Sequence, residues 1–174
     1  MINKYSDKEF SSIIKDILNI KEFQKTVYIK HHGITRYEHS LRVAYISYRI
    51  TKFLKLNYKE TTEAALLHDF FIDELEDKNT ASKLIKHPNI AVKNASKYID
   101  LTDRQKDIIK THMFPITFIP PKYLESWIVD IADDLSAIYE KIYSIRIQLL
   151  NAMKEVSLVG TFFFILLLNI VKTR

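Results

Sequence analysis

The sequence predicts an all-α fold in a single domain, and three observations support this. The chain has 174 residues, which is the size of one domain and enough to bury a full core. It contains only 2 Gly and 4 Pro, whereas an all-β fold needs many turns built from these residues. Apolar residues recur at helical spacing, often just after a capping signal. We therefore expect a bundle of about six to eight helices with an apolar helix at the C-terminus.

The N-terminal region, 1–30, is expected to form a helix that packs on the core of a main domain over 31–153. Its helix begins at Ser6, because Ser6 and Glu9 form a capping box of the type S-x-x-E. Apolar residues follow at helical spacing from Phe10 onward. The segment TVYI, 26–29, is the only strand-like piece and is too short to make a sheet.

A break around Gly33 precedes the second helix, which begins at Thr35 and runs to about Leu54. Glu38 closes a second capping box at its start. Its inner stripe is expected to contain His39, Val43, Ile46, Ile50 and Phe53.

The third helix begins near Asn57, again with a carboxylate, Glu60, three residues later. One face of it carries Ala64, Leu67, His68 and Phe71. The acidic segment DELEDKNT then forms a loop.

Two shorter helices are expected after this loop. A short helix covers 81–86, and Pro88 suits the first position of the next helix, with His87 as its cap. That helix ends near Tyr98. Thr102 and Gln105 cap another helix, which carries Ile108, Ile109 and His112 on one face.

Three prolines between 115 and 121 mark a loop, and a long helix follows from about 121 to 153. The remaining segment, 154–174, is expected to form a separate apolar helix. Its uncharged stretch 156–171 would span about 24 Å, less than the roughly 30 Å apolar slab of a bilayer. Two interpretations stay open: a buried helix or partner interface, which would support oligomers, and a short membrane anchor or membrane-surface helix.

The composition excludes several classes of protein. The absence of Cys excludes a disulfide scaffold, a thiolate zinc site, an iron–sulfur cluster and a Cys nucleophile. The N-terminus lacks the apolar core of a secretory signal, so we expect a cytoplasmic protein, membrane-associated only if the tail anchors it. The net charge of +5 is spread along the chain, which favours small anionic ligands over nucleic acid as partners.

The histidines provide the candidate chemistry. His39, His68 and His112 lie on inward helix faces, and Asp69 directly follows His68. Burying these groups separately would leave several polar atoms unsatisfied, whereas gathering them around a cation would satisfy them together. Imidazole and carboxylate ligands suit Fe, Mn, Co, Ni or Zn, and carboxylate-rich sites suit Mg.

The long helix supplies a further carboxylate ligand from Asp130, Asp133 or Asp134. Asp133 shares its face with Val129 and Ala137, which leaves room beside it. Spacing alone does not decide among the three, and a solvated acidic stripe is the alternative.

Taken in order, the sequence around these residues resembles the HD-domain superfamily of metal-dependent phosphohydrolases over roughly residues 31 to 140. The pattern consists of EHS at His39, LLHDF at His68 and Asp69, HP at His87, a helix-terminal His112 and IAD at Asp133. RYEHS followed by LHD is similar to small bacterial HD proteins that include diadenosine tetraphosphate hydrolases. The stretch HMFPITFIPPKYLESW is similar to small clostridial-type HD proteins.

The resemblance implies a role for each matching residue. His39, His68, Asp69 and Asp133 would be the primary metal ligands, and the A-D context selects Asp133. His87 and His112 match the extra histidines of the two-metal branch, in which the HD aspartate bridges two ions. Many two-metal relatives read HD-x-G-K, whereas this chain reads HDFFID and lacks the lysine, which argues against a cyclic-dinucleotide phosphodiesterase.

The implied function is hydrolysis of a nucleotide or another phosphate ester by water that the metal centre activates, with His68 and Asp69 as the catalytic pair. Arg36 and His32 are expected to contact the substrate phosphate. The alternatives are a surface Arg36 paired with an acid such as Glu38, and exposed loop histidines at His31 and His32. Two other functions remain open: a mixed-valent di-iron oxygenase, and a non-catalytic HD signalling or binding module.

Overall fold

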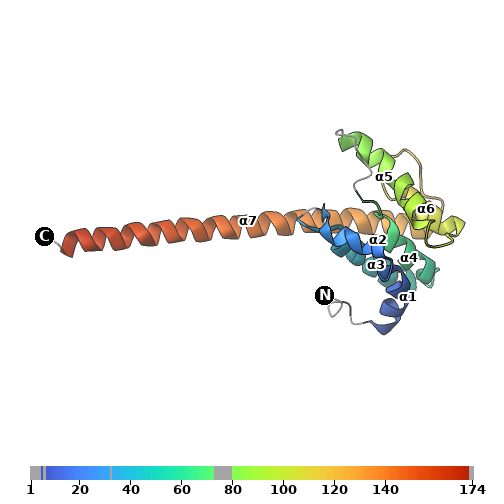
Figure 1. The fold of residues 1–174 in the computed structure, drawn as a ribbon, viewed down its shortest axis with the longest axis horizontal. Helices are drawn as coiled ribbons and strands as arrows, with labels where there is room; N and C mark the ends of the chain where they lie inside the picture. The colour runs from blue at the N-terminus through green and yellow to red at the C-terminus, as the bar shows by residue number, and fades with distance from the viewer. Residues whose placement is uncertain (1–4, 6, 32, 73–79, 173–174) are drawn as a thin grey trace.

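The all-α prediction is confirmed by the computed structural model, which describes residue 5 and residues 7–31, 33–72 and 80–172. Within these ranges the side chains of 31, 80, 81, 83, 157–160 and 162–172 lie outside the description. The described elements are α1 (Lys8–Leu18), α2 (Lys21–Gln24), the 3₁₀-helix η2 (Lys25–Tyr28), β1 (Lys30–His31), β2 (Ile34–Thr35), α3 (Arg36–Phe53), α4 (Tyr58–Leu67), α5 (Thr80–Ala95), α6 (Asp103–Thr111) and α7 (Leu124–Lys172). Helices α1 to α6 gather around one end of α7, which extends far beyond them (Figure 1).

Helix α1 begins one residue later than the Ser6 capping box predicts. Asp7 is its N-cap, and its carboxylate accepts hydrogen bonds from the backbone N–H groups of Glu9 and Phe10. Glu9 instead binds Lys52 and Tyr58 on the neighbouring helices. The prediction was wrong because two cap candidates lie side by side, and tertiary contacts take up the Glu9 carboxylate; Ser6 itself lies outside the described residues. Phe10, Ile14 and Ile17 are buried, so α1 packs on the core.

The segment TVYI is not strand-like in the structure. Thr26, Val27 and Tyr28 belong to η2, and the hydroxyl of Thr26 donates to the carbonyl of Phe23. A short hairpin follows instead, in which the two-residue strands β1 and β2 pair antiparallel. Gly33 lies in the turn of this hairpin with φ of +93°, a backbone conformation that residues other than glycine rarely adopt. The predicted break at this glycine is therefore confirmed.

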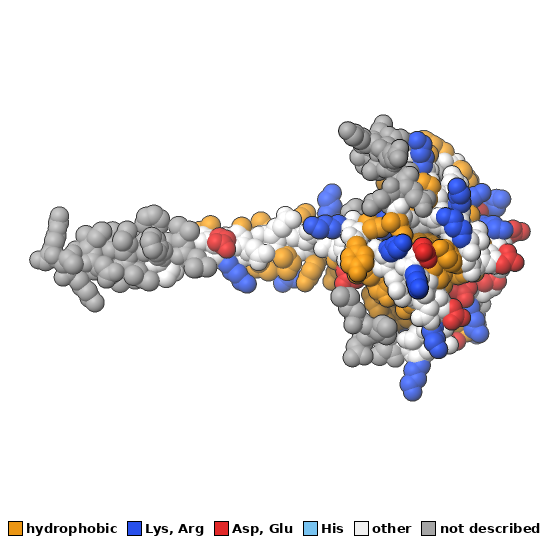
Figure 2. Space-filling model, in the orientation of Figure 1, with side chains coloured by type: hydrophobic (Ala, Val, Ile, Leu, Met, Phe, Trp, Pro, Cys, Tyr) orange, Lys and Arg blue, Asp and Glu red, His pale blue; other side chains and the backbone are white. Residues whose placement is uncertain are grey.

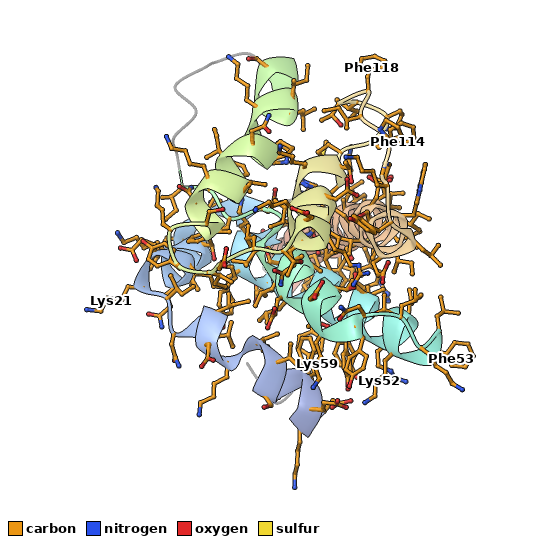
Figure 3. The ribbon with its side chains drawn as sticks, turned by 90° about the vertical axis from the view of Figure 1, so that its right-hand side faces the viewer. Lys21, Lys52, Phe53, Lys59, Phe114 and Phe118 are labelled. Atoms are coloured by element: carbon orange, nitrogen blue, oxygen red, sulfur yellow. The ribbon has the colours of Figure 1, made fainter. Side chains whose placement is uncertain are left out.

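Helices α3 and α4 form the centre of the body, and their predicted starts are confirmed. Thr35 and Glu38 make the capping box of α3, and Asn57 caps α4 by accepting from the N–H of Glu60. The end of the predicted α3 stripe is wrong, because Ile50 is 39% and Phe53 84% exposed. In the last turn of α3 Thr51 faces the core, whereas Phe53 points outward (Figure 3).

Helix α5 runs through Pro88 rather than beginning there, so the predicted split into a short helix and a second helix capped by His87 is wrong. A proline inside a helix removes one backbone hydrogen bond and crowds the preceding turn. The chain nevertheless stays helical on both sides of Pro88. Proline favours the first position of a helix, but it does not require that a helix begin there. His87 therefore lies within the helix.

Helix α6 has the predicted capping box of Thr102 and Gln105, and the proline-rich loop follows it. Asp107 fastens this loop, since its carboxylate accepts from the N–H of Lys122 at 2.9 Å and from the hydroxyl of Ser126 at 2.7 Å. Figure 3 shows Phe114 and Phe118 in this loop. The contacts of Asp107 fix where α7 begins and hence where its inward face lies.

Helix α7 is longer than predicted. It begins at Leu124 and runs without interruption past residue 153, where the sequence predicts that one helix ends and another begins. Over the part of the chain that the structure describes, no helix combines the length and apolar character needed to cross a membrane. The side chains on which the membrane or interface prediction for 156–171 rests lie almost entirely outside the described ones.

The core combines apolar side chains from most of the body helices. It includes Phe10 of α1, Tyr48 of α3, Leu66 of α4, Ile108 of α6 and Val129 of α7. Each of these side chains is almost fully buried. Close packing of this kind holds the helices rigidly relative to one another. The core therefore provides a fixed frame for polar residues that the helices direct to one place.

Candidate metal centre

Four histidines and two aspartates from five parts of the chain meet beside the core. Three overlapping groups of described residues each offer ligand atoms that all lie within 4.8 Å of one another: His39 with His68 and Asp69, His68 with His112 and Asp133, and Asp69 with His87 and His112. His39 comes from α3, His87 from α5 and Asp133 from α7, while His68 and His112 follow directly on α4 and α6. All six residues that the sequence singled out as metal ligands thus converge on a single site.

One half of the site joins α3 to α7. Nε2 of His39 lies 2.7 Å from Oδ1 of Asp133, and Nε2 of His68 lies 3.5 Å from the same oxygen. The His39 side chain is 1% exposed and that of Asp133 is 13% exposed. Asp133 therefore approaches both histidines from the more open side of the cluster.

The other half joins Asp69 to α5 and α6. Oδ1 of Asp69 lies 3.3 Å from Nε2 of His87 and 3.8 Å from Nε2 of His112. The two Nε2 atoms of these histidines are themselves 2.9 Å apart. Asp69 also belongs to the group that contains His39 and His68, so its carboxylate lies between the two halves.

Hydrogen bonds at Nδ1 orient three of the four imidazoles. The Nδ1–H of His68 donates to the carbonyl of Ala65 at 2.7 Å, and that of His112 donates to the carbonyl of Ile109 at 2.8 Å. Nδ1 of His39 donates to the carboxylate of Glu140, with a distance of 3.0 Å to Oε2. An imidazole that donates from Nδ1 can offer a lone pair at Nε2, which is the usual arrangement of a metal-binding histidine.

The residues fit a divalent transition metal ion. Nε2 of His68 is fully buried and makes no hydrogen bond to any described residue. A buried nitrogen that makes no hydrogen bond is costly, and a metal ion would give it a closer partner than the Asp133 oxygen 3.5 Å away. The Nε2 atoms of His87 and His112 face each other at 2.9 Å, so one cation could take a ligand from each ring. Four imidazoles with two carboxylates form a borderline donor set that suits Fe, Mn, Co, Ni or Zn.

The carboxylates stay ionised despite their burial. Burial acts to raise the pKa of Asp69, but the neighbouring histidines, His68 foremost, outweigh it and lower that pKa well below its usual range. The pKa of Asp133 is lowered in the same way, by His68 and His39. Burial lowers the pKa of His112 to about 3, with His68 and His87 adding to the effect, so His112 is neutral at physiological pH. Ionised carboxylates and a neutral imidazole are the protonation states that metal binding requires.

His39 behaves differently from His112. Burial acts to lower the pKa of His39, but its hydrogen bonds to Asp133 and Glu140 outweigh this effect and raise the pKa to about 10. In the metal-free protein a proton therefore occupies Nε2 of His39, in the place where a cation would bind. Metal uptake must displace this proton, so it is favoured by rising pH.

We expect the metal-free protein to lose stability as the pH rises from about 6.5 towards about 10. In this window folded His39 keeps a proton that the unfolded chain releases, so it contributes a fall of about 1.4 kcal/mol per pH unit to the free energy of unfolding. His68 adds to this fall, because burial acts to lower its pKa but Asp133 outweighs burial and raises it. Urea denaturation at several pH values in the presence of a chelator measures this slope. His39→Gln should make the slope smaller, and an equal slope in both proteins would contradict the assignment.

Arg36 lies inside the site and not on the surface. Its Nη1 donates to the carbonyl of Phe71 at 2.6 Å, and its Nε lies 3.7 Å from Oδ2 of Asp69. Its guanidinium stacks over the ring of Phe71 at 3.7 Å from the centroid. The alternative pairing with Glu38 is not formed, because Glu38 closes the α3 capping box. His32 lies outside the described residues, as does the side chain of His31.

Two residues that contribute to the site, Glu140 and Phe71, were not predicted from the sequence. Glu140 is buried, binds Nδ1 of His39 and pairs with Arg42. Phe71 positions Arg36 through both its carbonyl and its ring. The spacing contained a signal for Glu140, since it follows Asp133 by seven residues and so returns to the same face of α7.

The structure also separates the three aspartates of α7 that spacing left open. Only Asp133 belongs to a candidate metal group among the described residues. Asp130 is buried beside the loop at Phe114, and burial, with Asp134 adding to it, raises its pKa to about 7. Asp134 is exposed and its pKa is raised, first by partial burial and then by Asp133.

Comparison with known proteins adds one finding. A family model described as HD domain matches residues 36–138, which is more than half of the chain. The match begins at Arg36 and contains every residue of the three metal groups. No curated protein and no solved structure matches the chain.

Proposed function

Since this chain belongs to the HD-domain family, we propose that it hydrolyses a phosphate ester or anhydride, with a nucleotide as the favoured substrate class, at a dinuclear metal centre. HD domains are metal-dependent phosphohydrolases, and this chain presents His and Asp groups able to bind metal. We propose the nucleotide substrate and the second ion in addition.

One observation carries the proposal. Three histidines donate from Nδ1 to fixed acceptors, and each offers a ring nitrogen to overlapping groups of ligand atoms that also contain two ionised aspartates. An arrangement of this kind is costly to bury unless cations occupy it. Structural stability alone would be better served by apolar side chains of similar size.

The overlap of the three groups supports two ions. His39, His68 and Asp133 would hold one ion, while His87 and His112 would hold the other, with Asp69 shared between them. When bound, such a pair lowers the pKa of a coordinated water and neutralises phosphate oxygens as charge develops. Asp69 is suited to sharing because it belongs both to the group with His39 and His68 and to the group with His87 and His112.

The protein's own residues then bind and orient the phosphate. Arg36 presents a guanidinium beside Asp69, and this group can form paired hydrogen bonds with phosphate oxygens. The guanidinium stacks on the ring of Phe71, which fixes its orientation before substrate binds. Glu140 keeps Nδ1 of His39 protonated, which keeps Nε2 available to the metal. His32 remains a proposed second phosphate contact.

We expect Arg36→Gln to raise KM for a phosphate substrate by about tenfold or more, since a hydrogen bond to a charged group contributes roughly 1.5–3 kcal/mol. The metal content should stay unchanged, because Arg36 belongs to none of the metal groups. Steady-state kinetics with metal analysis measure both effects. Arg49→Gln is the matched control, because Arg49 is an exposed arginine on the same helix. An unchanged KM in Arg36→Gln would exclude the substrate role.

Elemental analysis of protein purified without chelator, together with a substrate panel, tests the proposed function. The panel contains nucleotides, dinucleoside polyphosphates and an aryl phosphate, and oxygen uptake is recorded in parallel. The proposal expects phosphate release that chelation abolishes and metal restores. Substrate-dependent oxygen uptake by an iron-loaded protein without phosphate release would instead identify an oxygenase. Metal-free protein that is inert on the whole panel would indicate a binding module.

A further inference from the structure

Helix α7 carries a regular apolar stripe on the side opposite the metal centre. Its residues alternate in steps of three and four along the helix, as in the a and d positions of a heptad. The members, here called the α7 seam, are Ile131, Leu135, Ile138, Ile142, Ile145, Leu149, Ala152 and Val156. Asp133 and Glu140, which serve the metal centre, fall at the outermost heptad position, away from the seam. One helix thus presents one face to the site and the opposite face outward.

The α7 seam is open to solvent over its whole length. Its seven large side chains are between 48 and 73% exposed, and Ala152 is also exposed. Helix α7 extends beyond the body, and apolar side chains are visible along the described part of this extension (Figures 1 and 2). A continuous exposed apolar stripe on a protein surface marks an interaction site.

The period of the α7 seam indicates the kind of partner. An isolated helix has 3.6 residues per turn, so a strict seven-residue repeat drifts around it unless the helix supercoils with another helix. The described seam spans almost four heptads, about 39 Å of helix, which is the length from which coiled coils become recognisable. The partner should therefore be a helix with the same repeat and a similar length. A second copy of this chain has a helix with the same repeat and the same length.

Charges beside the α7 seam favour an antiparallel arrangement. A parallel pair in register would place Lys141 at a g position beside Arg146 at an e position of the other copy, and this repulsion would occur twice. In an antiparallel pair centred near residue 147, residues 138–156 of the two copies lie against each other. Lys141 then faces Glu155 of the other copy, and this attraction occurs twice. Arg146 then meets its own copy once. These three side chains are all exposed and available for such contacts.

We propose that the α7 seam forms an antiparallel coiled coil with a second copy of this chain, giving a homodimer. The two bodies then lie at opposite ends of the paired helices. Because the seam faces away from Asp133 and Glu140, dimerisation leaves the metal centre accessible. The inference therefore stands independently of the proposed hydrolase function.

Neighbouring leucines provide a matched test of the interface. Leu149 lies on the α7 seam and is 60% exposed, whereas Leu150 lies off it and is 43% exposed. We expect the full chain to be a dimer by light scattering coupled to size exclusion at micromolar concentration. Leu149→Glu should be a monomer with unchanged helix content, and Leu150→Glu should remain a dimer. A monomeric full chain, or equal behaviour of the two variants, would overturn the proposal.

Single cysteines test the direction of the helices, since the chain has no cysteine of its own. Gln148 faces its own copy only in the antiparallel arrangement, and Ala152 faces its own copy only in the parallel one. We expect Gln148→Cys to give a disulfide-linked dimer on mild oxidation and Ala152→Cys to give none. The opposite result would overturn the antiparallel pair.

A membrane surface is the competing occupant, and sedimentation with vesicles of phosphatidylcholine and phosphatidylglycerol distinguishes it. We expect the soluble dimer to persist in the presence of these vesicles, with seam variants and wild type sedimenting alike. Vesicle binding by a monomeric wild type that Leu149→Glu abolishes would overturn the dimer proposal.

Discussion

Asp69→Asn is expected to reduce metal-dependent phosphate release by about 10³-fold or more and to leave the helices intact. The carboxylate of Asp69 lies between both halves of the site, so its loss removes a ligand from each proposed ion. Stabilisation of transition-state charge by metal ions contributes several kcal/mol, and each 1.36 kcal/mol corresponds to a factor of ten in rate. Asparagine has nearly the same shape, so the fold should tolerate it. Initial rates, metal content and circular dichroism measure the three effects.

The matched control for this substitution is Asp134→Asn, an exposed aspartate on α7 that belongs to none of the metal groups. It should retain activity and metal within a factor of about two. His68→Ala should behave like Asp69→Asn, because His68 belongs to two of the three groups. Full activity with retained metal in both Asp69→Asn and His68→Ala would show that the site lies elsewhere.

Glu140→Gln is expected to weaken metal binding by about 10- to 100-fold, although Glu140 is not itself a proposed ligand. Its carboxylate accepts the Nδ1 proton of His39 and thereby fixes the ring with Nε2 toward the metal. An amide at this position accepts more weakly and can also turn its NH₂ group toward the ring. The apparent metal affinity, measured by titration of the chelator-treated protein, should fall, and excess metal should restore much of the activity.

Glu63→Gln serves as the control for the loss of a partly buried carboxylate. Glu63 is hydrogen-bonded to Gln105 between α4 and α6, away from the metal ligands. Metal affinity in this variant should match the wild type. If Glu140→Gln bound metal as tightly as Glu63→Gln, the orienting role of Glu140 would be excluded.

The sequence predicted best those features that short-range chemistry determines. The caps at Thr35, Asn57 and Thr102 were found because a side chain and a backbone N–H three residues apart decide them locally. The sequence also singled out the six residues that the structure brings together, because polar residues on apolar helix faces are conspicuous and their order resembles a known pattern. Their role as metal ligands stays a prediction. This prediction of which residues meet required no knowledge of helix crossing angles.

The errors arose where tertiary contacts decide between local alternatives. Ser6 and Asp7 compete for the same cap, and the binding of Glu9 to Lys52 and Tyr58 is invisible in a local window. Phe53 fits the apolar stripe of α3, but Thr51 takes the buried position in the last turn and Phe53 lies on the outer face. Glu140 was missed because a single glutamate on a helix gives no sign of burial until His39 and Arg42 are placed against it.

The most direct test is a calorimetric titration of the chelator-treated full chain with Mn²⁺. The centre should bind two ions per chain saturably, with release of protons that include the one held by His39 at neutral pH. His68→Ala should lose this binding. A wild-type chain that takes up no Mn²⁺, or one whose uptake is the same as that of His68→Ala, would contradict the claim that these six side chains form a metal centre.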